Sequence, residues 1–138
     1  MAADRDPDVV RNAFDLWVGH TQDPTAKKAL LNAAISEDLD RRRAAAPLID
    51  RYKLGDSVEW LTAYSFDLEQ EATCELRQQA VSRLRALGDA RAVPALERAL
   101  ARRGKSGAYK GKPINGCLAD DARAAIGYLR GLVPVGHP

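Results

Sequence analysis

The residues most able to act together chemically form a basic segment in the C-terminal half of the chain. The cations and the one aromatic ring are Arg102, Arg103, Lys105, Tyr109, Lys110 and Lys112, with glycines between them. Ammonium and guanidinium groups bind phosphate and carboxylate oxygens, so the segment predicts a site for phosphate, an acidic peptide or a nucleic-acid backbone. The alternative is a solvated connection between two helices, which is the usual state of a run of charges.

Gly104-Lys105-Ser106, inside this segment, matches the end of a phosphate-binding loop motif. The full motif needs a glycine five residues before Gly104, where this chain has Ala99, and it follows a β-strand. The residues before Gly104 have the pattern of a helix instead. We therefore do not expect nucleotide hydrolysis at this loop.

The tryptophans and a run of three arginines could also form binding surfaces. Trp60 lies beside the apolar stripe of its predicted helix, so it is either a core residue or an exposed anchor for a partner. Trp17 fits a core position better. The arginines of 41–43 follow Glu37 and Asp38 at helical spacing, which favours a solvated helix face over a binding patch.

The histidines and cysteines are too dispersed to indicate a metal or catalytic site. His20, His137, Cys74 and Cys117 have no ligand spacing for zinc, and no nucleophile has a base beside it in the pattern. We predict no cofactor, no metal and no enzymatic activity. Two cysteines are few for a disulfide framework, so both are expected to be partly buried free thiols in a reducing compartment.

Composition predicts one helical domain. The chain has 138 residues, of which 46% are apolar, and it is rich in alanine and arginine, which favour helix. No apolar run is long enough to span a membrane, and the acidic start does not resemble a signal peptide. We therefore expect a cytoplasmic protein. Residues 1–69 hold 9 Lys+Arg and 13 Asp+Glu, a charge of −4, whereas residues 70–138 carry +6.

The clearest local pattern is a helix pair at 75–100. Gly88 is typical of a helix end, Asp89 of a cap for the turn that follows, and Pro94 of the first turn of the second helix. The first apolar stripe comprises Leu76, Ala80, Val81, Leu84 and Leu87, and the second comprises Val93, Leu96, Ala99 and Leu100.

The run LGDARAVPALERAL, after an amphipathic helix with Arg77, Ala80 and Leu84, resembles a HEAT repeat of the bilin-lyase-like subclass over about 30 residues. The resemblance implies an all-α solenoid of about seven antiparallel helices, stacked as pairs in a right-handed superhelix. It implies a scaffolding role through binding another protein or another domain, for example as a regulatory module of a bacterial signalling protein such as a kinase. HEAT-like DNA glycosylases are the enzymatic alternative, but this chain is short for that family and only locally basic.

The remaining segments are predicted around this repeat. In order they are two capping helices within 1–35 (7–19 and 24–35), a degenerate helix pair at 36–69, the HEAT-like repeat at 70–103, the basic loop at 104–117, a final helix at 118–132 and a tail at 133–138. Ser36 is expected to cap the helix after it, and Pro47 to kink or split that helix. Asp56 and Glu59 have capping-box spacing. The unpaired final helix favours a segment of a longer protein over a small complete domain.

Two spacings support the repeat. Leu54-Gly55-Asp56 recurs 33 residues later at Leu87-Gly88-Asp89, an interval typical of helix-pair repeats. The apolar positions of the final helix follow those of the first stripe with an offset of 45; they are Ala125, Ile126, Leu129 and Leu132. The excess over 33 is about the length of the basic loop.

Overall fold

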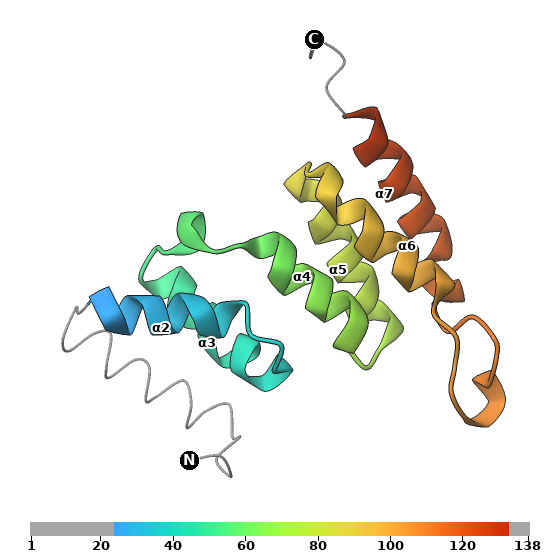
Figure 1. Ribbon diagram of the computed structural model, residues 1–138, viewed down its shortest axis with the longest axis horizontal. Coiled ribbons are helices and arrows are strands. Elements are labelled where there is room, and N and C mark those ends of the chain that lie inside the picture. Colours follow the sequence, from blue (N-terminus) through green and yellow to red (C-terminus); the bar gives the residue numbers. More distant parts are fainter. Residues whose placement is uncertain (1–23, 133–138) are drawn as a thin grey trace. The chain divides into compact units, whose positions relative to one another are not determined.

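The structure is a computed structural model that describes residues 24–132, and every regular element in this part of the chain is a helix (Figure 1). Its α-helices are α2 (Pro24–Ala34), α3 (Leu39–Arg51), α4 (Trp60–Gln70), α5 (Cys74–Leu87), α6 (Val93–Ala101) and α7 (Ala119–Gly131). Short 3-10 turns connect them, and no β-strand occurs between residues 24 and 132. The predicted all-α class is confirmed. The predicted helix at 7–19, with Trp17, and the tail at 133–138 lie outside the described residues.

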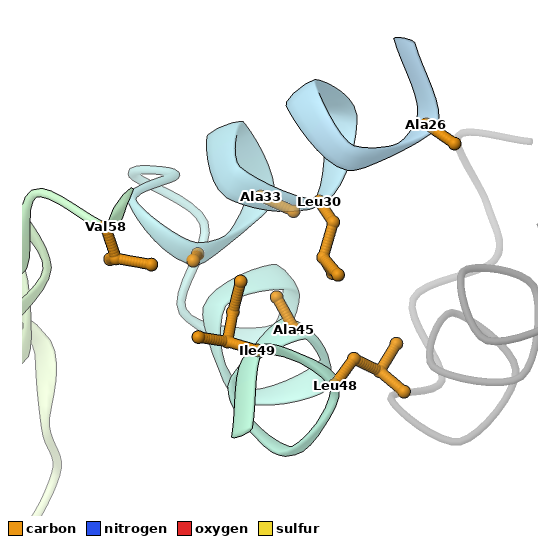
Figure 2. Close-up of a cluster of buried hydrophobic side chains, with 8 residues drawn as sticks. Ala26, Leu30, Ala33, Ala45, Leu48, Ile49 and Val58 are labelled. Carbon is orange, nitrogen blue, oxygen red and sulfur yellow. The ribbon is translucent and has the colours of Figure 1, made fainter. Parts of the chain in front are cut away.

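The described residues form two compact units, with the boundary inside α4 after Ala63. In the first unit α2 packs on α3 through small and branched side chains, which Figure 2 shows meeting between the two helices. The buried set is Ala26, Leu30, Ala33, Ala34, Ala45, Leu48, Ile49 and Val58. Alanines let the two backbones approach, and each fully buried leucine contributes roughly 1.5–3 kcal/mol from the apolar surface it removes from water.

Helix α3 begins at a different cap than predicted, and Pro47 does not split it. Its N-cap is Asp38, whose carboxylate accepts from the amides of Asp40 and Arg41. Ser36, the predicted cap, lies two residues earlier, and its hydroxyl oxygen accepts from the Asp38 amide. The helix also runs through Pro47 without being split. Both Pro47 and the residue four positions before it are exposed, so water can hydrate the carbonyl that loses its helical partner there.

The two Leu-Gly-Asp tripeptides adopt different conformations. At the second one Gly88 has φ 65° and ends α5, and the Asp89 carboxylate accepts from the Arg91 amide, as predicted. At the first, the left-handed residue is Lys53, with φ 55°, and Gly55 opens a 3-10 turn. Because α4 begins only at Trp60 and no side chain caps this turn, the predicted capping box at Asp56 is wrong.

The second unit is built from the end of α4 with α5, α6 and α7. Pro94 lies in the first turn of α6, as predicted. The buried positions include Leu68, Ala80, Val81, Leu84, Leu96, Leu118, Ala125 and Leu129. Leu87 and Leu132 were predicted in the core but are 38% and 44% exposed. Each lies at the C-terminal end of its helix.

The prediction of two free thiols is wrong. Cys74, the first residue of α5, is bonded to Cys117, in the turn before α7, with 6.5 Å between their Cα atoms. The fold brings them together because α5 and α7 pack side by side, which places the start of α5 against the turn that leads into α7. None of the helices between residues 24 and 132 has the length and apolar character needed to cross a membrane.

Candidate functional site

The basic segment forms a closed, hydrogen-bonded loop between α6 and α7, which extends beyond the two helices (orange in Figure 1). At its base the Ile114 amide donates to the Arg102 carbonyl over 3.2 Å. Further out, the Gly104 amide donates to the Lys112 carbonyl over 2.9 Å, and the Gly111 amide donates to the Gly104 carbonyl over 2.9 Å. The segment was predicted as a loop, and its backbone bonds give that loop a defined form.

Glycines make this form possible. A Cβ on Gly104 would overlap the backbone carbonyl of Tyr109, so the two sides of the loop approach each other only because residue 104 has no side chain. Gly107 and Gly111 have φ of 68° and 74°, in the left-handed region that other residues adopt at a cost. The sequence therefore specifies the fold of the loop through these three glycines.

The loop presents its cations to solvent. Arg103, Lys105, Lys110 and Lys112 are exposed, and within the described residues no carboxylate forms an ion pair with any of them. From residue 98 to residue 119 the chain has six Lys or Arg and no Asp or Glu. Tyr109, 62% exposed, lies among these cations. Such a surface can accept an anion without first breaking an ion pair.

Arg102 has a different role from the other predicted site residues. Its guanidinium donates to the Glu69 carbonyl at the C-terminal end of α4, where backbone acceptors lack helical partners. Arg77 binds nearby and donates from Nη1 to the carbonyls of Glu71 and Ala72 over 2.9 and 3.1 Å. Burial lowers the pKa of the Arg77 guanidinium, and the adjacent charge of Arg102 lowers it further. Arg102 thus holds the base of the loop.

Asn115 connects the C-terminal end of the loop to α6 and to α5. It is buried; its Nδ2 donates to the Ala99 carbonyl over 2.9 Å, and its Oδ1 accepts from Arg77 Nε over 2.8 Å. Sequence reasoning missed both Asn115 and Arg77 as positioning residues. An asparagine before a glycine indicates only a turn, and its partners lie 16 and 38 residues away in the chain.

The disulfide fixes the same end of the loop covalently. Cys117 follows Asn115 by two residues, and its bond to Cys74 joins the loop to the first turn of α5. The Gln78 side-chain amide, one turn further along α5, donates to the Cys117 carbonyl over 3.0 Å. The C-terminal end of the loop is therefore held more firmly than its tip.

Trp60, the remaining predicted site residue, belongs to the first unit. Trp60 packs against the core of the first unit, and its indole N–H donates to the Gly55 carbonyl over 2.9 Å. Of the three arginines at 41–43, Arg42 is buried and donates to the Ser36 carbonyl over 2.7 Å. Both residues therefore contribute to the fold of the first unit.

A shallow groove lies beside the base of the loop. Its lining comprises Leu68, Glu69, Gln70, Arg98, Ala99, Ala101 and Arg102. Arg98 Nε lies 3.6 Å from Glu69 Oε1, so these two charges of the groove are already paired, unlike the lysines of the loop. No cluster of three or more potential metal ligands occurs in the described part of the chain.

No family model, curated protein or solved structure matches this chain. The resemblance to HEAT repeats therefore stays a prediction from the sequence.

Proposed function

We propose that this chain is a non-catalytic interaction module, a HEAT-like helical support that displays the loop at 102–112 to an acidic partner. The partner is another protein, or another domain of a longer chain, and a regulatory role in a cytoplasmic bacterial signalling protein such as a kinase fits the resemblance. The observation that carries the proposal is the contrast between the fixed base of the loop and its exposed, unpaired cations.

The mechanism is rigid display. Folding already fixes the loop backbone through its own hydrogen bonds and its anchors, so little backbone entropy remains to be lost when a partner binds. The cations also steer an acidic surface toward the loop before contact, which raises the association rate. The helices supply the support, and the loop supplies the charge.

The test compares two matched double variants. Lys110→Ala with Lys112→Ala removes two loop charges, whereas Lys27→Ala with Lys28→Ala removes two exposed charges from α2. Fluorescently labelled polyglutamate serves as the acidic probe, with binding read by anisotropy at low salt. We expect the loop variant to bind at least about tenfold more weakly and the α2 variant to bind as the parent does. An equal loss of affinity in both variants would mean that binding depends only on net charge, which would contradict the proposal.

A nucleic-acid backbone is the second candidate, and the exposed ring of Tyr109 among lysines favours it. Single-stranded DNA of about 20 nucleotides is the probe. Contacts with phosphates release counterions, so affinity must fall steeply between about 50 and 200 mM salt. Tyr109→Ala should then weaken DNA binding severalfold while leaving polyglutamate binding unchanged. Tighter binding of polyglutamate than of DNA at equal salt would favour the protein partner.

A further inference from the structure

The Cys74–Cys117 disulfide is accessible to reductants. Cys117 is exposed and Cys74 is half-buried, so a small thiol in solution can reach the bond. In compartments where glutathione keeps thiols reduced, protein disulfides are usually transient or redox-sensing ones. This bond is accessible and lies at the end of the loop, so its reduction would remove a covalent link between the loop and α5.

The loop has no core of its own to maintain its form. Every residue from 105 to 113 is exposed, so order in the loop depends on its backbone hydrogen bonds and on the anchors at its ends. At the C-terminal end the non-covalent anchors are the hydrogen bonds of Asn115 and of the Cys117 carbonyl, together with the fully buried side chain of Leu118. The one between Gln78 and Cys117 is exposed to water, which competes for both groups. The disulfide is the only covalent member of this set.

We propose that the Cys74–Cys117 disulfide is a redox clamp on the basic loop. In the oxidised form it holds residues 115–118 against the start of α5 and keeps the loop closed, whereas reduction loosens that end. The effect on partner binding rests on the proposed function of the loop. The effect on loop order does not, and it can be measured alone.

The switch needs a low-molecular-weight thiol as its reductant. The reductant thiolate attacks the Sγ of Cys117, the more exposed of the two residues, the S–S bond breaks, and its electron pair leaves on Cys74 Sγ. That sulfur lies in the first turn of α5, where the helix dipole stabilises a negative charge. A second reductant thiol then displaces Cys117 from the mixed disulfide. The protein gains two electrons and two protons as a dithiol, and the reductant leaves as its disulfide.

The test uses the whole chain with and without dithiothreitol, and trypsin as a probe of loop order. Cleavage after Lys105 and Lys110 reports how often the loop opens. We expect reduction to raise this cleavage rate by at least about threefold, with helical circular dichroism unchanged. The variant Cys74→Ser with Cys117→Ser should show the faster rate in both buffers. Alkylation after reduction, followed by mass spectrometry, confirms that both thiols have formed.

Each outcome decides one proposal. Equal cleavage rates with and without reductant overturn the clamp. A loss of helicity with cleavage along the whole chain also overturns it, because reduction would then unfold the whole unit instead of loosening the loop on a folded unit. Polyglutamate and single-stranded DNA are titrated in the same two buffers. If cleavage rises on reduction but neither probe binds in either state, the clamp stands and the proposed function fails. If binding is equal in both states although cleavage differs, the clamp does not regulate binding.

Discussion

Cations on the helical part of the second unit have carboxylate or aromatic partners, whereas, within residues 24–132, the lysines of its loop do not. Arg91 binds Asp89 at 2.7 Å, Arg98 lies 3.6 Å from Glu69, and Arg130 lies 3.3 Å from Glu97. The guanidinium of Arg85 stacks over the ring of Tyr128, 4.7 Å from its centroid. The loop lysines have no such partners among the described residues. The same residue class thus stabilises the helices in one region and remains available to a ligand in the other, which a count of charges does not reveal.

The two regions also differ in what keeps them folded. Leu84 and Leu96 are completely buried, so the helices are held by apolar packing that tolerates changes of surface charge. The loop buries no side chain between residues 105 and 113 and depends on glycines, backbone bonds and anchors. Substitutions should therefore separate the regions, because core changes alter stability and loop changes alter order or binding.

The largest effect is expected from the core of the helices. Leu84→Ala should lower the free energy of unfolding by about 2–5 kcal/mol, since it removes buried apolar contacts and leaves a cavity. The matched control is Leu87→Ala in the same helix, which is 38% exposed and should cost about 1 kcal/mol. Urea unfolding followed by circular dichroism measures both. Equal losses of stability in the two variants would mean that α5 does not bury the face that carries Leu84.

The disulfide comes next. Replacing Cys74 and Cys117 together by serine should lower the free energy of unfolding by about 2–4 kcal/mol, because the bond joins residues 43 apart and so restricts the unfolded chain. Urea unfolding of the parent chain in reductant should reproduce the curve of the variant. An unfolding midpoint that does not move in either experiment would show that the bond contributes nothing to global stability.

Asn115 tests the buried anchor of the loop. Asn115→Ala removes the partner of the Ala99 carbonyl and of Arg77 Nε and should cost about 1–3 kcal/mol. Asn32→Ala, on the exposed face of α2, is the matched control and should change stability by less than about 0.5 kcal/mol. Thermal unfolding of the two variants makes the comparison. A loss of stability in Asn115→Ala that is no larger than the loss in the control would contradict the anchoring role.

Most of the helical framework was predictable because it rests on local patterns. The stripes around Leu84 and Leu96, the left-handed Gly88 and the capping Asp89 are short-range features, and the structure contains each of them. The exposure of Leu87 was not predictable, because the spacing that defines a stripe does not show where the neighbouring helices end.

The site was only partly predictable. Its cations and glycines are adjacent in the sequence, so the loop and its charge followed directly from the residues. Its anchors depend on pairs far apart in the chain, such as Cys74 with Cys117 and Arg77 with Asn115, for which no local signal exists. The position of Trp60 beside the stripe fits both a core and a surface residue, and only the packed structure places it on the core.

Gly104 separates the shape of the loop from its charge. Gly104→Ala keeps every cation but places a methyl group against the Tyr109 carbonyl, so the loop must open. We expect polyglutamate to bind about 3–10-fold more weakly, equivalent to roughly 1 kcal/mol. Gly116→Ala is the control, since nothing lies within 4 Å of an added Cβ there. Unchanged binding in Gly104→Ala would show that charge alone suffices and that the closed form of the loop is irrelevant.

The smallest effect concerns the two Leu-Gly-Asp tripeptides. Hydrogen bonds from the Arg91 side chain and amide lower the pKa of Asp89 below its usual 3.8. A carboxylate whose pKa is lowered by folding stabilises the fold above its unfolded pKa, and that contribution disappears as pH falls through the folded pKa. Asp89→Asn should therefore cost a few tenths of a kcal/mol near pH 7, because the pair is largely solvated, and nothing once Asp89 is protonated.

Asp56→Asn is the matched control, because Asp56 occupies the same place in the first tripeptide but caps nothing. Thermal unfolding of the parent chain and both variants from pH 7 down to about pH 2 makes the comparison. The difference between parent and Asp89→Asn should narrow with acid, whereas the difference for Asp56→Asn should stay near zero at every pH. If the stability of both variants depended on pH in the same way, the two tripeptides would be equivalent in solution. That result would favour the repeat predicted from their 33-residue spacing and contradict the two different turns.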